Sequence, residues 1–233
     1  RMPDADCYIA SLSQDNARWI VVSTSPKQAN ASHLVETATG TVKPLFNERP
    51  DLADQPLVGM QTVRIPSRDW LPLVSYLSLP PTVDTSRPST PLPLVLNIHG
   101  GPWARDIYCH AEDHQWLANR GYAVMSVNYR GSTGFGKAFV NAGDGEHGAK
   151  MHDDLIDAVN WAVDQGIADP AKVAIMGASY AGYAAYVGAT FTPDVFCCTI
   201  PIVGFTDVQT LVESIPPYWE DERALFIDRY GDP

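Results

Sequence analysis

The fold is decided by the stretch Val173-Ala-Ile-Met-Gly-Ala-Ser-Tyr-Ala-Gly182. Its apolar first half predicts a strand buried on both faces, and the small residues that follow predict a helix to about residue 189. Ser179 stands at the turn between them, where a strained backbone needs small residues two positions before and two after. Gly177 and Ala181 occupy these positions. The pattern predicts that Ser179 is a catalytic nucleophile on a strand-to-helix elbow, rather than an ordinary helix N-cap serine.

A second glycine motif lies about 80 residues upstream. His99-Gly-Gly-Pro102 directly follows the apolar run at residues 94–98, which predicts another buried strand. On the α/β-hydrolase fold, such a loop supplies one backbone N–H to an oxyanion hole, and the residue after the nucleophile supplies the other. We therefore predict that the N–H groups of Gly101 and Tyr180 are the two donors. A plain strand-exit turn is the alternative.

Strands and helices alternate around these two motifs. The expected strands cover residues 60–65, 71–79, 94–98, 122–127, 172–176 and 197–203, and the expected helices cover 112–120, 150–165 and 179–189. The second helix is the clearest, because Met151, Leu155, Val159 and Ala162 recur at helical spacing on one face. This alternation predicts an α/β fold with a doubly wound, mostly parallel sheet.

The beginning of the chain has a different pattern. Short runs at residues 8–12, 19–23, 32–36 and 42–46 are separated by polar turns, which predicts four strands of one all-β unit. Such a unit resembles one blade of a β-propeller. We divide the chain into a terminal blade at residues 1–50, a linker at 51–58 and part of a catalytic domain at 59–233.

Further stretches occur in a fixed order along the chain: Val127-Asn-Tyr-Arg-Gly-Ser-Thr-Gly-Phe-Gly136, Met151-His-Asp-Asp-Leu155 and Gly231-Asp-Pro233. Together with the two glycine motifs, they resemble the prolyl oligopeptidase family of serine peptidases, and its acylaminoacyl-peptidase and dipeptidyl-aminopeptidase branch most closely. The resemblance implies hydrolysis of short peptides through an acyl-enzyme on Ser179, with the propeller screening out large folded substrates.

Three positions depart from the family's pattern. Ala181 replaces the usual glycine of the elbow, and Trp70 stands where a glycine often follows Arg-Asp in a hairpin. His99 stands where some branches place a tyrosine whose hydroxyl helps to hold the oxyanion. We expect the backbone of Gly101 to serve this purpose here.

A catalytic triad on this fold runs in the order Ser, then Asp or Glu, then His. All the histidines precede Ser179: His33, His99, His110, His114, His147 and His152. We therefore expect the acid and the base to lie C-terminal to these 233 residues, in a longer enzyme of which this inactive piece carries the nucleophile. A non-catalytic peptide-binding homologue and a carboxylesterase of the same fold remain the alternative functions.

Two further motifs suggest other chemistry. Gly131-Ser-Thr-Gly-Phe-Gly-Lys137 begins like a phosphate-binding loop, but Ala138 follows where a hydroxyl would bind Mg²⁺. His110 and His114 lie one helical turn apart, for which a solvated helix face is the more common explanation than a metal site. We therefore expect neither a cofactor nor a metal, and the sequence assigns no substrate-binding residue.

The composition limits the possible partners. The chain has 16 basic and 27 acidic residues, a net charge of −11, which argues against nucleic acid and anionic membranes. Its four cysteines lack metal-site spacing and are expected to be buried free thiols, which favours a reducing compartment such as the cytoplasm. A homo-oligomer is left open.

Overall fold

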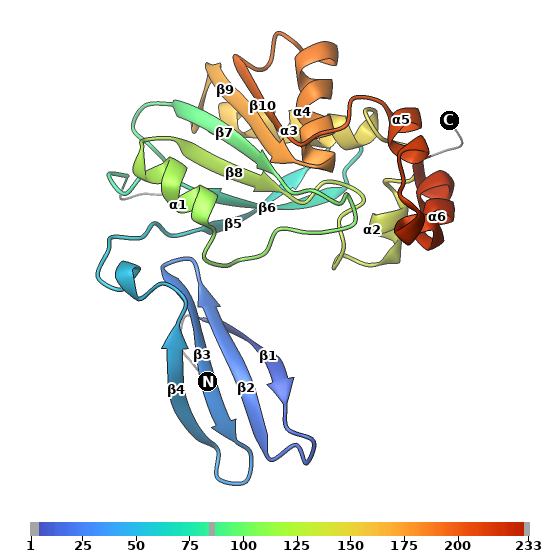
Figure 1. Ribbon diagram of the computed structural model, residues 1–233. Coiled ribbons are helices and arrows are strands. Elements are labelled where there is room, and N and C mark those ends of the chain that lie inside the picture. Colours follow the sequence, from blue (N-terminus) through green and yellow to red (C-terminus); the bar gives the residue numbers. More distant parts are fainter. Residues whose placement is uncertain (1–4, 84–86, 231–233) are drawn as a thin grey trace.

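A computed structural model describes residues 5–83 and 87–230, and these residues form two β-sheets (Figure 1). The motif Gly231-Asp-Pro233 lies outside the described residues. The first sheet is a four-stranded antiparallel meander of β1 (Asp6–Leu12), β2 (Arg18–Ser25), β3 (Gln28–Glu36) and β4 (Thr41–Asn47). The four predicted strands are therefore confirmed, whereas their assignment to a propeller blade remains a prediction.

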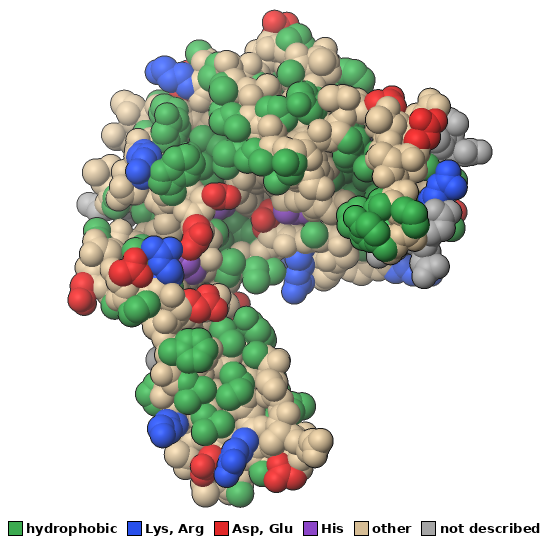
Figure 2. All heavy atoms as spheres, viewed as in Figure 1, with side chains coloured by type: hydrophobic (Ala, Val, Ile, Leu, Met, Phe, Trp, Pro, Cys, Tyr) green, Lys and Arg blue, Asp and Glu red, His purple; other side chains and the backbone are tan. Residues whose placement is uncertain are grey.

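The four-stranded sheet projects away from the rest of the molecule (Figure 1). Apolar side chains of its outer strands are exposed, among them Tyr8, Leu12, Val42 and Phe46 (Figure 2). The sheet contacts the second part through Gln115, whose Nε2 donates to the carbonyl oxygens of Pro26 and Val58, both at 2.9 Å. A single sheet with two open faces cannot bury both of them by itself.

The second sheet has six strands in the order β10-β9-β7-β8-β6-β5. Its elements are β5 (Gln61–Pro66), β6 (Pro72–Ser78), β7 (Leu92–Ile98), α1 (Glu112–Asn119), β8 (Ala123–Val127), α2 (Lys137–Asn141), α3 (Lys150–Asp164), β9 (Ala168–Ala178), α4 (Tyr180–Phe191), β10 (Cys198–Ile202), α5 (Val208–Glu213) and α6 (Glu220–Tyr230). Short 3₁₀ turns occur at Pro50–Leu52 and Pro217–Trp219. Strands β8, β7, β9 and β10 run parallel, whereas the β5–β6 hairpin pairs antiparallel with β8 through β6.

Helices cover both faces of this sheet. Along β7, Leu94 and Leu96 point into the larger core, which also contains buried residues of α3 and α4. Val95 points to the other face and packs with Leu117 and Ala118 of α1. The fold is therefore the predicted doubly wound α/β arrangement. The predicted apolar face of α3 is also confirmed, because Met151, Leu155, Val159 and Ala162 are all buried.

Several boundaries differ from the expectation. The sequence did not predict α2, α5 or α6, because the first two have only 5 and 6 residues and the third is rich in charge. Strand β9 begins at Ala168 and includes Asp169-Pro170, so it starts four residues before the predicted strand at 172–176. Pairing of Ala168 with Leu92 of β7 extends the strand. Tertiary pairing here overrides a local turn signal.

The expectation of buried cysteines is wrong. Cys7, Cys197 and Cys198 are exposed, and Cys109 is half-buried, although all four are free. Cys7 and Cys198 lie on β1 and β10, which are edge strands of their sheets in this chain. Every residue of β1 is exposed and so are alternate residues of β10, Cys198 among them, because no other layer of the described chain covers these faces. Among the described residues, no helix has both the length and the apolar character needed to cross a bilayer.

Candidate functional site: the strand-to-helix elbow at Ser179

Ser179 lies between the end of β9 and the first residue of α4, as predicted. Its backbone angles are φ 60° and ψ −120°, a combination that residues with a side chain rarely adopt. Its N–H donates to the carbonyl oxygen of Ile202 at 3.0 Å, which ties the turn to the neighbouring strand β10. The surrounding sheet therefore holds the serine in a strained conformation.

Ala181 fits into the elbow because Gly177 has no side chain. A Cβ placed on Gly177 would overlap the Cβ of Ala181 and would lie 2.8 Å from the carbonyl oxygen of Ile98. Ala181 itself is fully buried. The departure from the usual glycine at position 181 is thus accommodated without opening the turn.

The glycine loop after β7 passes directly against the elbow. A Cβ placed on Gly100 would lie 3.0 Å from the carbonyl oxygen of Ala178 and 3.6 Å from the Cβ of Ser179. Gly101 has φ +121°, a conformation that favours glycine. Segments 80 residues apart in the sequence therefore meet at the serine, because β7 and β9 are adjacent parallel strands.

Polar groups at this junction are left without partners. The hydroxyl of Ser179 does not cap the helix that follows it, and the side chain is exposed. Among the described residues, no hydrogen bond involves the Ser179 hydroxyl or the backbone N–H of Gly101 or Tyr180. A serine that served only as an N-cap would accept a bond from the first turn of the helix. The observed arrangement does not fit that alternative.

His99 is held by several contacts that sequence reasoning missed. Its ring stacks on Tyr129 at 4.5 Å between centroids, and its Nε2 lies 2.9 Å from the hydroxyl of Ser132. Its Nδ1 lies 2.8 Å from the carbonyl oxygen of Gly100. Burial lowers the pKa of His99 to about 4, so the ring is neutral near pH 7. The only signal in the sequence was that His99 begins the glycine loop.

Arg130 has a structural role in the turn after β8. Its guanidinium is 4% exposed and forms ion pairs with Asp154 at 2.7 Å and Asp69 at 2.8 Å. The backbone N–H of Arg130 also donates to Asp154 at 2.8 Å. These bonds fix the turn after β8 to α3 and to the β5–β6 hairpin. Trp70, next to Asp69 in that hairpin, has φ 67° and is 83% exposed.

Aromatic side chains surround Tyr180 on the side of α6. Tyr230 stacks on His147 at 3.9 Å and on Phe226 at 5.6 Å, and Trp103 contacts Phe226 edge-on. The remaining members of the cluster are Tyr183 and Phe205. Tyr218 and Trp219, just before α6, are 82% and 50% exposed. Core packing therefore does not explain them.

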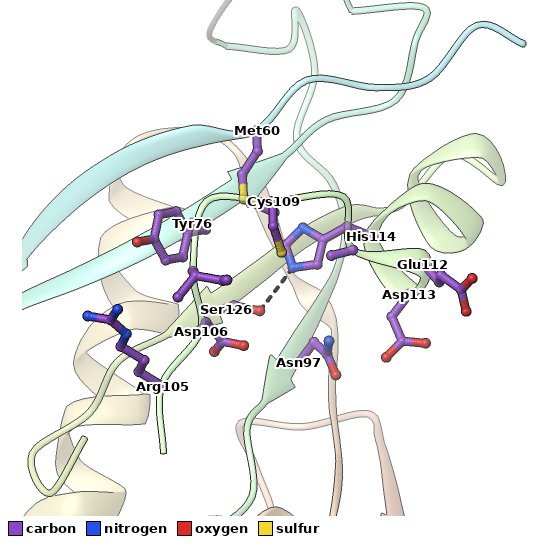
Figure 3. A pocket seen from close by; sticks show the side chains of 12 residues that line it. Met60, Tyr76, Asn97, Arg105, Asp106, Cys109, Glu112, Asp113, His114 and Ser126 are labelled. Atoms are coloured by element: carbon purple, nitrogen blue, oxygen red, sulfur yellow. Dashed lines mark hydrogen bonds between the residues drawn. The ribbon is translucent and has the colours of Figure 1, made fainter. Parts of the chain in front are cut away.

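Two cavities lie on the α1 side of the site. One, of about 350 Å³, is lined by Gly100, Gly177 and Ala178, and shares Asn97, Asp106 and Asp113 with a second of about 470 Å³ (Figure 3). A carboxyl oxygen of Asp106 is buried without a hydrogen-bond partner among the described residues. Burial raises the pKa of Asp106 to about 7.

The expectation that His110 and His114 lie on a solvated helix face is wrong. His110 precedes α1, and both of its ring nitrogens are buried without a hydrogen-bond partner among the described residues. His114 lies on α1 but faces the interior. The His114 side chain is 2% exposed, and its Nδ1 lies 3.0 Å from the hydroxyl of Ser78. Its Nε2 lies 2.9 Å from the hydroxyl of Ser126 (Figure 3). Helix α1 turns this histidine toward the sheet, so it is a satisfied core residue. No group of three metal-ligating side chains occurs in the described part of the chain.

A sequence profile of the prolyl oligopeptidase family matches residues 110–225, which is about half of the chain. The chain belongs to the prolyl oligopeptidase family. Similar curated proteins include dipeptidyl aminopeptidase BIII of Pseudoxanthomonas mexicana, which is 50% identical over 231 residues, or 98% of this chain and 34% of the relative. Dipeptidyl peptidase family member 6 of Caenorhabditis elegans is 40% identical over 98% of this chain and 33% of its own length.

Solved structures show the same fold. A puromycin-hydrolysing peptidase of Mycobacterium tuberculosis has a TM-score of 0.82 and 29% identity, over 93% of this chain and 33% of its own. A crystal structure of puromycin hydrolase has a TM-score of 0.85 and 25% identity, over the whole of this chain and 35% of its own. This prolyl oligopeptidase-family chain thus spans about a third of the length of the relatives it matches.

Proposed function

We propose that the protein is a serine peptidase that hydrolyses short peptides through an acyl-enzyme on Ser179. The observation that carries the proposal is the junction of β9, α4 and the loop after β7. There an exposed serine, whose hydroxyl has no partner within residues 5–83 and 87–230, stands on a strained turn, and a Cβ on Gly100 would lie only 3.6 Å from the serine Cβ. Strain of this kind in a non-glycine residue is typical of functional positions.

The proposed chemistry begins with attack of the Ser179 oxygen on a peptide carbonyl carbon. The serine proton passes to a general base, and the amine leaves after receiving that proton. Water then cleaves the ester and regenerates the serine. The N–H groups of Tyr180 and Gly101 are the proposed donors to the negatively charged oxygen of each tetrahedral intermediate, because neither has another partner among the described residues.

The general base is proposed to come from outside these 233 residues. The histidines all precede Ser179, and within the described chain none hydrogen-bonds to its hydroxyl. In a protein as long as the relatives, the acid and then the histidine would follow the nucleophile in the order usual for this fold. We expect the 233-residue chain alone to be inactive, because an unassisted serine hydroxyl is a weak nucleophile.

The proposed substrates are short peptides that lose a dipeptide from the amino terminus. Support comes from the 50% and 40% identity to proteins named dipeptidyl aminopeptidase and dipeptidyl peptidase, each covering 98% of this chain. Acylaminoacyl-peptide hydrolysis is the second candidate, because acylamino-acid-releasing enzymes match with 30–37% identity over shorter regions.

A fluorophosphonate probe on the full-length protein tests the proposal. We expect labelling of the wild type at Ser179 and none of Ser179→Ala. Absence of wild-type labelling would leave the non-catalytic peptide-binding alternative. Unlabelled protein from the same preparation is then assayed with dipeptidyl, acylaminoacyl and simple ester substrates of the same chromophore. Faster turnover of the ester alone, with no peptide cleavage, would instead indicate a carboxylesterase.

A further inference from the structure

We propose that Tyr129 and Ser132, in the turn after β8, are positioning residues that hold the glycine loop at residues 99–104 in place for oxyanion binding. The inference rests on the proposed function, because it assigns a role in the same site. Neither side chain reaches the surface, since Tyr129 is 1% and Ser132 is 0% exposed. They therefore act through the loop and not by touching the substrate.

The turn is bonded to both ends of the glycine loop. At the beginning of the loop, the hydroxyl of Tyr129 donates to the carbonyl oxygen of His99 at 2.9 Å. At its end, the backbone N–H of Thr133 donates to the carbonyl oxygen of Ala104 at 2.8 Å. Gly101 lies between these two attachments, so the direction of its N–H depends on both of them.

Ser132 contacts the side chain of His99, whereas Tyr129 bonds to its backbone carbonyl. Its hydroxyl lies 2.9 Å from the Nε2 of His99 and 2.6 Å from the carbonyl oxygen of Tyr129. The single proton of the Ser132 hydroxyl is donated to the carbonyl of Tyr129, so its oxygen accepts from Nε2 in the neutral tautomer that carries the ring proton there. The Tyr129 ring stacks on the imidazole. The imidazole ring of His99 is thus held by polar contacts at its edge and by stacking on one of its faces.

The turn itself is anchored where it begins. Arg130 lies between the two positioning residues, and its buried guanidinium bonds to Asp154 of α3. The backbone N–H of Ser132 donates to the carbonyl of Tyr129 at 3.0 Å. Burial raises the pKa of the Tyr129 hydroxyl well above its usual value, so it remains a donor at any working pH. A rigid support of this kind is what an oxyanion donor requires, because small displacements from the productive geometry lower the rate.

The test uses the full-length enzyme with Tyr129→Phe and Ser132→Ala, which each delete one hydroxyl. Tyr129→Phe keeps the ring that stacks on His99. Ser23→Ala is the matched control, because Ser23 makes the same kind of contact, 3.0 Å to the Nε2 of His33, in the four-stranded sheet. Active sites are titrated with the fluorophosphonate probe, and kcat and KM are measured per titrated site, with Tm alongside.

We expect kcat per titrated site to fall about tenfold in each variant and about a hundredfold in the double variant, with KM changed less than about threefold. The control should keep the wild-type kcat. If the wild type fails to label at Ser179, the proposed function and this inference both fail. If the wild type labels but kcat per titrated site stays within about twofold in both variants, the positioning role alone is overturned. That result would hold even if Tm fell, since a purely structural role lowers the active fraction and not the rate per site.

Discussion

Arg130 and Asp154 form a two-bond ion pair in the interior, with Nε to Oδ2 at 2.9 Å and Nη2 to Oδ1 at 2.7 Å. Asp154 is completely buried, so no water can replace the arginine as its partner. We expect Asp154→Asn to lower the free energy of unfolding by roughly 3–5 kcal/mol, because it leaves the guanidinium buried without its main countercharge. Chemical denaturation of the full-length protein measures the loss.

The matched control for that variant is Asp153→Asn. Asp153 also pairs with an arginine, at 2.7 Å from Arg68, but both side chains are over a third exposed. Exposed pairs contribute at most about 1 kcal/mol, so this variant should remain within that range of the wild type. Equal losses from the two variants would show that burial is not the source of the effect.

The elbow makes a prediction about Gly177 and Ala181. A methyl group on Gly177 would overlap Ala181, so we expect Gly177→Ala to lower stability by about 1–3 kcal/mol and to abolish probe labelling at Ser179. The double variant Gly177→Ala/Ala181→Gly should recover part of the loss only, because the carbonyl oxygen of Ile98 would still lie 2.8 Å from the new Cβ. Gly59→Ala serves as control, since its new methyl would meet only the flexible end of Lys27. If the losses of stability from the two single changes simply added up in the double variant, that result would contradict the contact between positions 177 and 181.

We expect Asp106 to lower the free energy of unfolding as the pH rises. Its pKa is raised by burial from 3.8 to about 7, so between these values the folded state keeps a proton that the unfolded state has released. Stability therefore falls with pH across this window, and the penalty is complete above pH 7. We expect Asp106→Asn to gain stability relative to the wild type between pH 4.5 and pH 8, measured by denaturant unfolding. A difference that is constant with pH would count against the buried, unpaired carboxyl.

We expect His114 to have the opposite effect at lower pH, where the free energy of unfolding falls as the pH decreases. Burial lowers its pKa from 6.5 to about 4, so the unfolded state binds a proton in this window that the folded state does not. Its contribution is present above pH 6.5 and is lost as pH falls toward 4, by about 3 kcal/mol at most. We expect His114→Gln to be less stable than the wild type at pH 7 and to show a shallower decline on acidification. An unchanged slope would contradict the assignment.

Much of the fold could be predicted from local patterns. The alternation of apolar runs with helical spacing predicted the strands from β5 to β10 and the helices α1, α3 and α4, since each has a length and a periodicity that propensity can detect. Short helices such as α2 and α5 have no such signal. The start of β9 at Ala168 depends on pairing with Leu92, which no local pattern contains.

Some residues of the candidate site could likewise be predicted from local patterns, and others could not. The small residues around Ser179 and the glycines at 100 and 101 could be recognised in the sequence, because sterics at a tight turn restrict the residue type at each position. The hydrogen-bonding and ion-pair partners of His99, Arg130 and His114 could not be recognised in this way. Serine, tyrosine and aspartate are common residues, and nothing in their immediate neighbours marks them as members of a buried network.

Local patterns were enough to predict the alternating α/β order, the elbow at Ser179 and the glycine loop after β7, because each depends on residues within a few positions of one another. The contacts of Arg130 with Asp154, 24 residues away, and of His99 with Ser132, 33 residues away, became visible in the folded chain alone. Those contacts follow from the strand order β9-β7-β8, which brings the ends of distant segments to one edge of the sheet. The physical reason is that burial and hydrogen bonding act through space, whereas propensity and periodicity act along the chain.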